Sequence, residues 1–168
     1  MAEGDPEAHR EIYERFAPAV FSYLAGRLHD RGVAEDVFQE CMLEAWHSAG
    51  RFRGDSRVLT WLLAIAHYQA TNRLRRYRRE DTTDPDLLER RNGTAHSAAA
   101  SDTRIDVRSA IGALPPGQQA ALELVFFHGL TVDESAAVLA IAPGTVKSRL
   151  FRAKAALRPR LSTETTHV

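Results

Sequence analysis

The stretch TVDESAAVLAIAPGTVKSRLFRAKAAL, residues 131–157, decides the fold of the second half of the chain. Thr131 and Glu134 have the spacing of a capping box, which predicts a short helix from about Val132 to Leu139. The segment AIAPG then turns the chain, and Pro143 is a residue favoured in the first turn of a helix. Two helices joined by a short turn form a helix-turn-helix arrangement.

The second of these helices has two different faces. Its apolar residues recur at intervals of four, three and four and predict a buried stripe of Val146, Leu150, Ala153 and Leu157. The opposite side carries polar and basic residues that are expected to point outward, namely Thr145, Ser148, Arg149 and Arg152, with Lys147 and Lys154 on one flank. In a helix-turn-helix, residues of this kind reach bases and phosphates in the major groove. Phe151 contacts either a thymine methyl group or a neighbouring helix. The alternative for the whole helix is a solvated basic face.

Charge is sorted along a chain that is neutral overall, with 22 basic and 22 acidic residues. Residues 1–50 hold four basic and ten acidic residues, and residues 81–143 hold four and nine. By contrast, residues 51–80 hold eight arginines and two acids, and residues 144–160 hold six basic residues and no acid. Two basic segments suggest two contacts with a polyanion, although either alone could be an ordinary helix surface.

The periodicity of the remaining chain predicts an all-α fold of two small domains. Residues 7–80 are helical in pattern, with Pro18 expected near a helix start or break and a turn and cap at Gly54–Asp55. Residues 81–104 lack periodicity and predict a flexible linker. Helical pattern returns over residues 105–161, with Gly129 as the expected end of a helix before the helix-turn-helix.

The segment NRLRRYRRE, residues 72–80, carries more positive charge than helix capping requires. The aromatic residues Phe52, Trp61, His67 and Tyr68 precede it, and interleaved rings and arginines suit single-stranded nucleic acid. Trp61 is expected mainly in the core, and His67 and Tyr68 are expected at the surface. Upstream, Asp36, Glu40 and Glu44 recur at helical spacing, as either a solvated acidic face or a docking surface for a basic protein.

Other functional classes receive little support from the sequence. The single cysteine, Cys41, cannot form an internal disulfide, and no Cys or His spacing indicates a metal site. Cys41 lies on a predicted apolar stripe without a basic neighbour, which argues against an enzyme or redox sensor. The acidic N-terminus does not resemble a signal peptide, and no apolar run is long enough to span a membrane, so a cytoplasmic protein is expected.

Taken in order, these motifs resemble the extracytoplasmic-function sigma factors of the sigma-70 superfamily. AEDVFQECMLEAW, residues 34–46, is similar to the family's polymerase-binding motif. RFRGDSRVLTWLLAIAHYQATNRLRR, residues 51–76, is similar to the segment that melts and reads the −10 promoter element. Residues 114–157 resemble the domain that reads the −35 element. The ordered set covers almost the whole chain.

The resemblance implies roles for particular residues. Asp36, Gln39 and Glu40 would contact the clamp coiled coil of core RNA polymerase, with the flap as a further contact of the protein. The −10 strand would meet Phe52, Arg53, Arg57, His67, Tyr68, Asn72, Arg73, Arg75 and Arg76. The −35 duplex would meet Thr145, Lys147, Ser148, Arg149 and Arg152. The family further implies promoter DNA and an anti-sigma factor as partners, no cofactor or metal, and no enzymatic activity.

The chain departs from the family pattern at a few positions. Tyr68 and Asn72 stand where Asn and Asp are common, at promoter-facing positions. Ala140 stands at a turn position that is often Gly, where a left-handed conformation would cost roughly 1 kcal/mol. Ser135 replaces a common Ile. The runner-up function is a helix-turn-helix repressor or activator that does not bind polymerase, which would leave the first domain unexplained.

Overall fold

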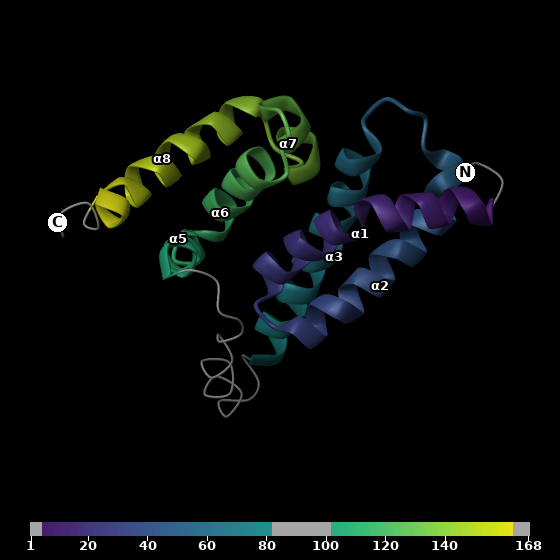
Figure 1. The fold of residues 1–168 in the computed structure, drawn as a ribbon, viewed down its shortest axis with the longest axis horizontal. Helices are drawn as coiled ribbons and strands as arrows, with labels where there is room; N and C mark the ends of the chain where they lie inside the picture. Colours follow the sequence, from purple (N-terminus) through teal and green to yellow (C-terminus); the bar gives the residue numbers. More distant parts are fainter. Residues whose placement is uncertain (1–4, 82–101, 163–168) are drawn as a thin grey trace. The chain divides into compact units, whose positions relative to one another are not determined.

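The computed structural model describes residues 5–81 and 102–162, all helices and connecting turns without a strand in those ranges (Figure 1). The described chain forms two compact units, one containing α1 to α3 and the other α5 to α8. Of the expected linker, Asp81 ends α3 and residues 102–104 begin α5. The rest of that segment lies outside the described residues.

The first unit consists of α1 (Pro6–Leu28), α2 (Arg31–Ser48) and α3 (Val58–Asp81), which pack against one another. Asp5 caps α1 by accepting the Glu7 amide, and Asp30 caps α2 by accepting the Val33 amide, both at 2.9 Å. The fully buried side chains of this core come from all three helices and include Val20, Tyr23, Leu24, Val37, Cys41, Leu62 and Leu63. Burial of these apolar groups fixes the faces that α2 and α3 turn to solvent.

Pro18 lies inside α1, so the expectation of a helix start or break at this residue is wrong. A proline in a helix interior removes a backbone hydrogen bond and costs about 3 kcal/mol. Buried residues on its C-terminal side, Val20 and Leu24 among them, hold the helix against α2 and α3. This packing offsets the local cost, which a local pattern does not reveal.

The connection between α2 and α3 begins with a short 3-10 turn, Ala49–Arg51. Gly54 adopts φ +77°, which confirms a turn at this glycine. Asp55 does not cap the next helix, because α3 begins at Val58 and the Arg57 carbonyl accepts the Trp61 amide at 3.1 Å. The loop therefore extends a few residues further than expected.

The second unit consists of α5 (Asp102–Gly112), α6 (Pro116–Leu122), α7 (Val132–Leu139) and α8 (Pro143–Ser162). Between α6 and α7 the helix widens into a π turn, Glu123–Phe127, where the sequence predicted ordinary helix. This turn leaves Phe126 and Phe127 exposed. Gly129 then adopts φ +65°, as expected for the residue that ends the helix.

The capping box of α7 is confirmed in both directions. The Glu134 amide donates to Thr131 Oγ1 at 3.1 Å, and the Thr131 amide donates to Glu134 Oε2 at 2.8 Å. At the other end Ala140 is left-handed, with φ 53° and ψ 45°, and the Ile141 amide donates to the Ala136 carbonyl at 3.1 Å. These two ends define the turn that sets α8 against α7.

Within the part of the chain that the structure describes, no helix combines the length and apolar character needed to cross a membrane.

Candidate nucleic-acid interface

Helix α8 presents the two faces that its spacing predicts. Val146, Leu150, Ala153 and Leu157 are buried, and α8 packs against α6 and α7. Thr145, Lys147, Ser148 and Arg152 are exposed. The Ser148 hydroxyl donates to the Gly144 carbonyl at 3.1 Å, which orients its oxygen while leaving it open to solvent. The exposed face is basic and polar, the composition that binds phosphates and base edges.

Arg149 lies differently from the other residues of this face. It is half-buried, and its guanidinium group lies on the backbone of Gly117 in the first turn of α6. A Cβ atom at position 117 would meet the Arg149 Cζ atom at 2.9 Å. Because only glycine leaves this space open, Gly117 forms a seat for the Arg149 side chain.

Phe151 is 76% exposed, so it does not pack against a neighbouring helix in the described structure. Lys154, three residues further along α8, holds its ammonium group 5.0 Å from the centre of the Phe126 ring on the π turn. The structure therefore contradicts the second alternative for Phe151, and an apolar contact to a base stays a prediction.

The outward face of α3 forms an aromatic and basic strip. Tyr68 is 66% exposed, Asn72 is half-buried, and Arg75 and Arg76 are exposed. Residues 68, 72, 75 and 76 share one side of a helix because they are spaced by three and four. Trp61, seven residues before Tyr68, continues the strip toward the preceding loop.

That loop carries a second ring. Phe52 and Trp61 stack with centroids 4.9 Å apart and planes inclined by 34°. Both rings are half-buried, so Trp61 packs against the unit in large part and remains accessible in part. Arg53 and Arg57 are exposed on the loop between α2 and α3 (Figure 1). Rings beside arginines offer a stacking surface and phosphate contacts together.

His67 is less accessible than its neighbour Tyr68. It is half-buried, and its Nδ1 atom lies 2.8 Å from the hydroxyl of the buried Tyr23 on α1. This contact ties His67 to the core of the unit, whereas the sequence predicted a surface position.

Helix α2 turns an acidic face to solvent. Asp36, Gln39 and Glu40 are exposed, while the intervening Val37 and Cys41 are buried. Burial, with a smaller contribution from Glu40, raises the pKa of the Cys41 thiol to about 12. The thiol is therefore neutral and shielded near neutral pH, which argues against a reactive cysteine.

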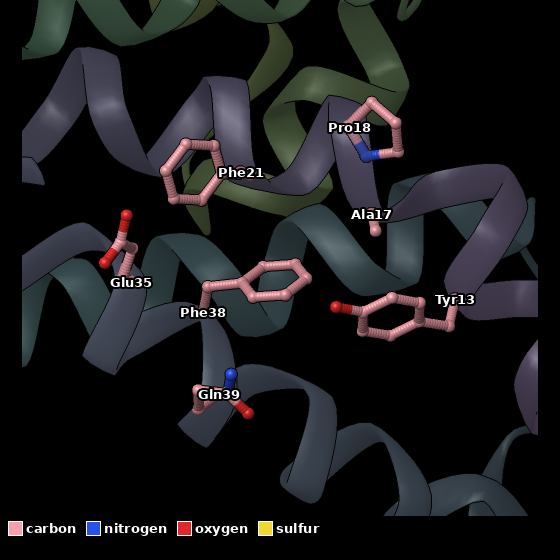
Figure 2. Close-up of a pocket in the computed structure, with 7 residues that line it drawn as sticks. All are labelled: Tyr13, Ala17, Pro18, Phe21, Glu35, Phe38 and Gln39. Atoms are coloured by element: carbon pink, nitrogen blue, oxygen red, sulfur yellow. The ribbon is translucent and has the colours of Figure 1, made fainter.

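An apolar hollow of about 350 Å³ lies beside this acidic face, between α1 and α2 (Figure 2). The Phe38 ring stands between Tyr13 and Phe21, at centroid distances of 5.8 and 5.9 Å. Gln39 and Glu35 stand at the α2 side of the hollow. A surface with both apolar and acidic parts suits a protein partner better than nucleic acid.

Glu40 and Arg73, which the sequence assigns to different surfaces, meet in the structure. Arg73 Nη2 donates to Glu40 Oε1 at 2.6 Å, across the packing of α2 and α3. A hydrogen bond with Tyr77 raises the pKa of Arg73, partial burial opposes this, and the carboxylates of Glu40 and Asp36 add to the rise. Arg73 is therefore drawn from the strip toward α2.

The geometry defines a class of protein: two helical units, each with a basic face suited to nucleic acid, and one acidic face suited to protein. The family model of sigma-70 region 2 matches residues 12–80, and that of sigma-70 region 4 matches residues 104–157. The RNA polymerase sigma-H factor of Pseudomonas aeruginosa is 31% identical to this chain, and the ECF RNA polymerase sigma-E factor of Escherichia coli K12 is 33% identical. Each alignment covers 94% of this chain and 88% of the relative. The chain therefore belongs to the sigma-70 family, as a sigma factor of the extracytoplasmic-function type.

Solved structures show the same fold. The sigma factor RpoE in complex with the anti-sigma factor NepR from Bartonella quintana has a TM-score of 0.77 at 23% identity, covering 92% of this chain and 97% of that one. CnrH in complex with the cytosolic domain of CnrY has a TM-score of 0.71 at 24% identity, covering 97% and 93%.

Two contributions to these surfaces were not predicted from the sequence. Gly117 leaves room for the Arg149 side chain, and the Glu40–Arg73 pair joins two helices. Both are tertiary contacts and leave no periodic signal in the sequence.

Proposed function

We propose that this chain binds core RNA polymerase through α2, and contacts promoter DNA through α3 and α8. The observation that carries the proposal is the presence of two separate basic faces and one acidic face on a sigma-70 framework. Each face has the composition that its partner requires. No enzymatic step is proposed, and the site of action is the cytoplasm, where transcription takes place.

The second unit anchors duplex DNA at the −35 element. In a helix-turn-helix, the N-terminal part of the second helix enters the major groove. On α8 this places Thr145, Ser148 and Arg152 at base edges and Lys147 at phosphates, with Phe151 as an added apolar contact. Arg149 joins this set from its seat on Gly117.

The first unit holds the unpaired −10 strand. Flipping a base out of the duplex costs a few kcal/mol, which stacking and phosphate contacts offset. The strip supplies Trp61 and Tyr68 for stacking, and Arg75 and Arg76 for phosphates. Phe52, Arg53 and Arg57 hold an extruded base at the loop, while Asn72 and His67 offer polar contacts.

The acidic face of α2 serves the polymerase. Asp36, Gln39 and Glu40 are proposed to contact the clamp coiled coil, which must offer basic groups to such a face. The hollow around Phe38 adds apolar area next to Gln39. The flap is a further polymerase contact in this proposal. An anti-sigma protein is the proposed regulatory partner, as NepR is for the sigma factor RpoE, whose fold this chain shares.

The proposal is tested by transcription in vitro with purified core polymerase and a genomic promoter library. Core with this protein is expected to give transcripts from defined start sites that core alone does not give. The Asp36→Asn variant, which retains the α2 cap at Asp30, should bind core less tightly and give fewer transcripts. Absence of any start site that depends on the protein would contradict the proposal.

A stand-alone DNA-binding regulator is distinguished by co-purification with core polymerase. That alternative predicts binding to duplex DNA without binding to core. Retention of core on the immobilised chain would exclude it.

A further inference from the structure

Glu40 on α2 and Arg73 on α3 form an ion pair between residues proposed for two different partners. Their nearest atoms are 2.6 Å apart, and the Arg73 side chain is 19% exposed while that of Glu40 is 50% exposed. The pair therefore lies at the edge of the packing of α2 and α3, where a partner can reach the carboxylate. A cationic donor of a partner can therefore approach the carboxylate and compete with Arg73 for its negative charge.

Arg73 stands at the border between the core and the strip of α3. Ala70, three residues before it, is fully buried, and Arg76, three residues after it, is exposed. Tyr77 forms a hydrogen bond with its side chain, and the Asp36 carboxylate also attracts it. The carboxylates of Glu40 and Asp36, both on α2, attract the guanidinium group toward that helix, although α3 would allow it to turn toward Arg76 and the strip.

We propose that the Glu40–Arg73 pair couples polymerase binding to strand binding. In the free chain Glu40 holds Arg73 against α2. A basic group of the polymerase that binds the Glu40 carboxylate competes with Arg73 and releases it toward the promoter strand. The inference rests on the proposed function, since it takes Glu40 as a polymerase contact and Arg73 as a strand contact.

The magnitude of the coupling follows from the position of the pair. Exposed ion pairs contribute little, whereas charge-assisted bonds of a mostly buried arginine contribute more. The expected coupling is therefore about three- to tenfold in affinity, which tunes binding without abolishing it. Coupling is reciprocal, so each ligand must strengthen the other by the same factor.

The first test measures binding of the free full-length chain to a fluorescein-labelled oligothymidine strand. Glu40→Gln is expected to tighten strand binding about three- to tenfold, because it releases Arg73. The gain should vanish when Arg73→Ala is added. Glu44→Gln is the matched control, since it removes the same charge from the same helix without touching the pair.

Two outcomes of this first test would overturn the coupling. One is an equal gain in Glu40→Gln and Glu44→Gln, which would be a general effect of charge. The other is a gain that persists in the Glu40→Gln/Arg73→Ala double variant.

The second test measures binding to core polymerase in the absence of DNA. Arg73→Ala is expected to tighten core binding about three- to tenfold, because Glu40 no longer has an internal partner. Arg10→Ala, which removes an equal charge from the exposed surface of α1, should leave it unchanged. Unchanged core affinity in Arg73→Ala overturns the coupling, whereas failure of the wild-type chain to bind core contradicts the proposed function itself and leaves the strand result standing.

Discussion

Ala140 stores backbone strain at the turn between α7 and α8. Its φ of 53° and ψ of 45° are left-handed values that a Cβ atom disfavours by about 1 kcal/mol. Ala140→Gly is therefore expected to stabilise the second unit by about 1 kcal/mol, reduced in part by the greater freedom of glycine in the unfolded chain. The gain is measured as slower hydrogen exchange of the buried amides of α8.

The control for this substitution lies three residues earlier. Ala137 is exposed inside α7 and has an ordinary helical position. The same change there, Ala137→Gly, should destabilise the unit by about 1 kcal/mol. If glycine destabilises the second unit at both residues, the left-handed conformation of Ala140 does not carry the expected strain.

At single residues, the sequence predicts what depends on near neighbours. The left-handed conformation of Ala140 and the capping box of Thr131 and Glu134 follow from a few adjacent positions and are confirmed. Pro18 shows the limit, because the local rule predicts a break and the structure has a continuous helix. The packing that keeps α1 intact comes from helices distant in sequence.

At the scale of one helix, the seat of Arg149 joins α8 to α6. Gly117→Ala would place a Cβ atom 2.9 Å from the guanidinium carbon, so the flexible side chain must move while the backbone need not. Alanine is favoured over glycine in a helix, so the fold should hold or become slightly more stable. We expect weaker binding of the holoenzyme to its promoter, by about two- to fivefold, because the arginine side chain is no longer held in one position.

The weaker promoter binding of Gly117→Ala should arise only through the Arg149 side chain. In an Arg149→Ala background, Gly117→Ala should have no further effect on promoter affinity. Gly112→Ala is the matched control, because a Cβ atom there meets open space. If Arg149→Ala binds the promoter weakly and Gly117→Ala binds it like the wild type, Arg149 contacts DNA without needing its contact with Gly117.

Helices differ in how much of their surface the sequence can predict. The period of α8 places the buried stripe and the exposed residues correctly, because one face of an amphipathic helix must pack. The same reasoning leaves out Gly117 and the π turn at Phe126, since both depend on how one element meets the next. Likewise, the sequence does not distinguish Arg73 from the other four arginines of its basic helix. The packing of α2 and α3 places Glu40 beside it.

For the whole molecule, net charge conceals the surfaces that matter. The chain is neutral, yet the strip of α3 and the outer face of α8 are both basic and lie on separate units. Phosphate contacts make DNA affinity fall with salt in proportion to the number of phosphates neutralised, whatever the total charge of the protein. Steep salt dependence is therefore expected for a neutral protein of this design.

The two basic faces lie on separate units, so the effects of Arg76→Ala and Arg152→Ala can be predicted quantitatively. Each should weaken promoter binding by the holoenzyme, and the losses in free energy should add to within about 0.5 kcal/mol in the double variant, because the two arginines lie on separate units and act independently. The measurement is holoenzyme affinity for labelled promoter DNA over a series of salt concentrations. Removing Arg76, which is proposed to bind a phosphate, should reduce the salt slope by about one. Arg31→Ala, which removes an exposed arginine paired with Glu35 on α2, is the control and should leave the slope unchanged.

The double variant also tests whether the two faces bind different promoter elements. If it binds the promoter no more weakly than the weaker of the two single variants, both arginines act at the same place on the DNA. The assignment of separate faces to separate promoter elements would then have to be abandoned.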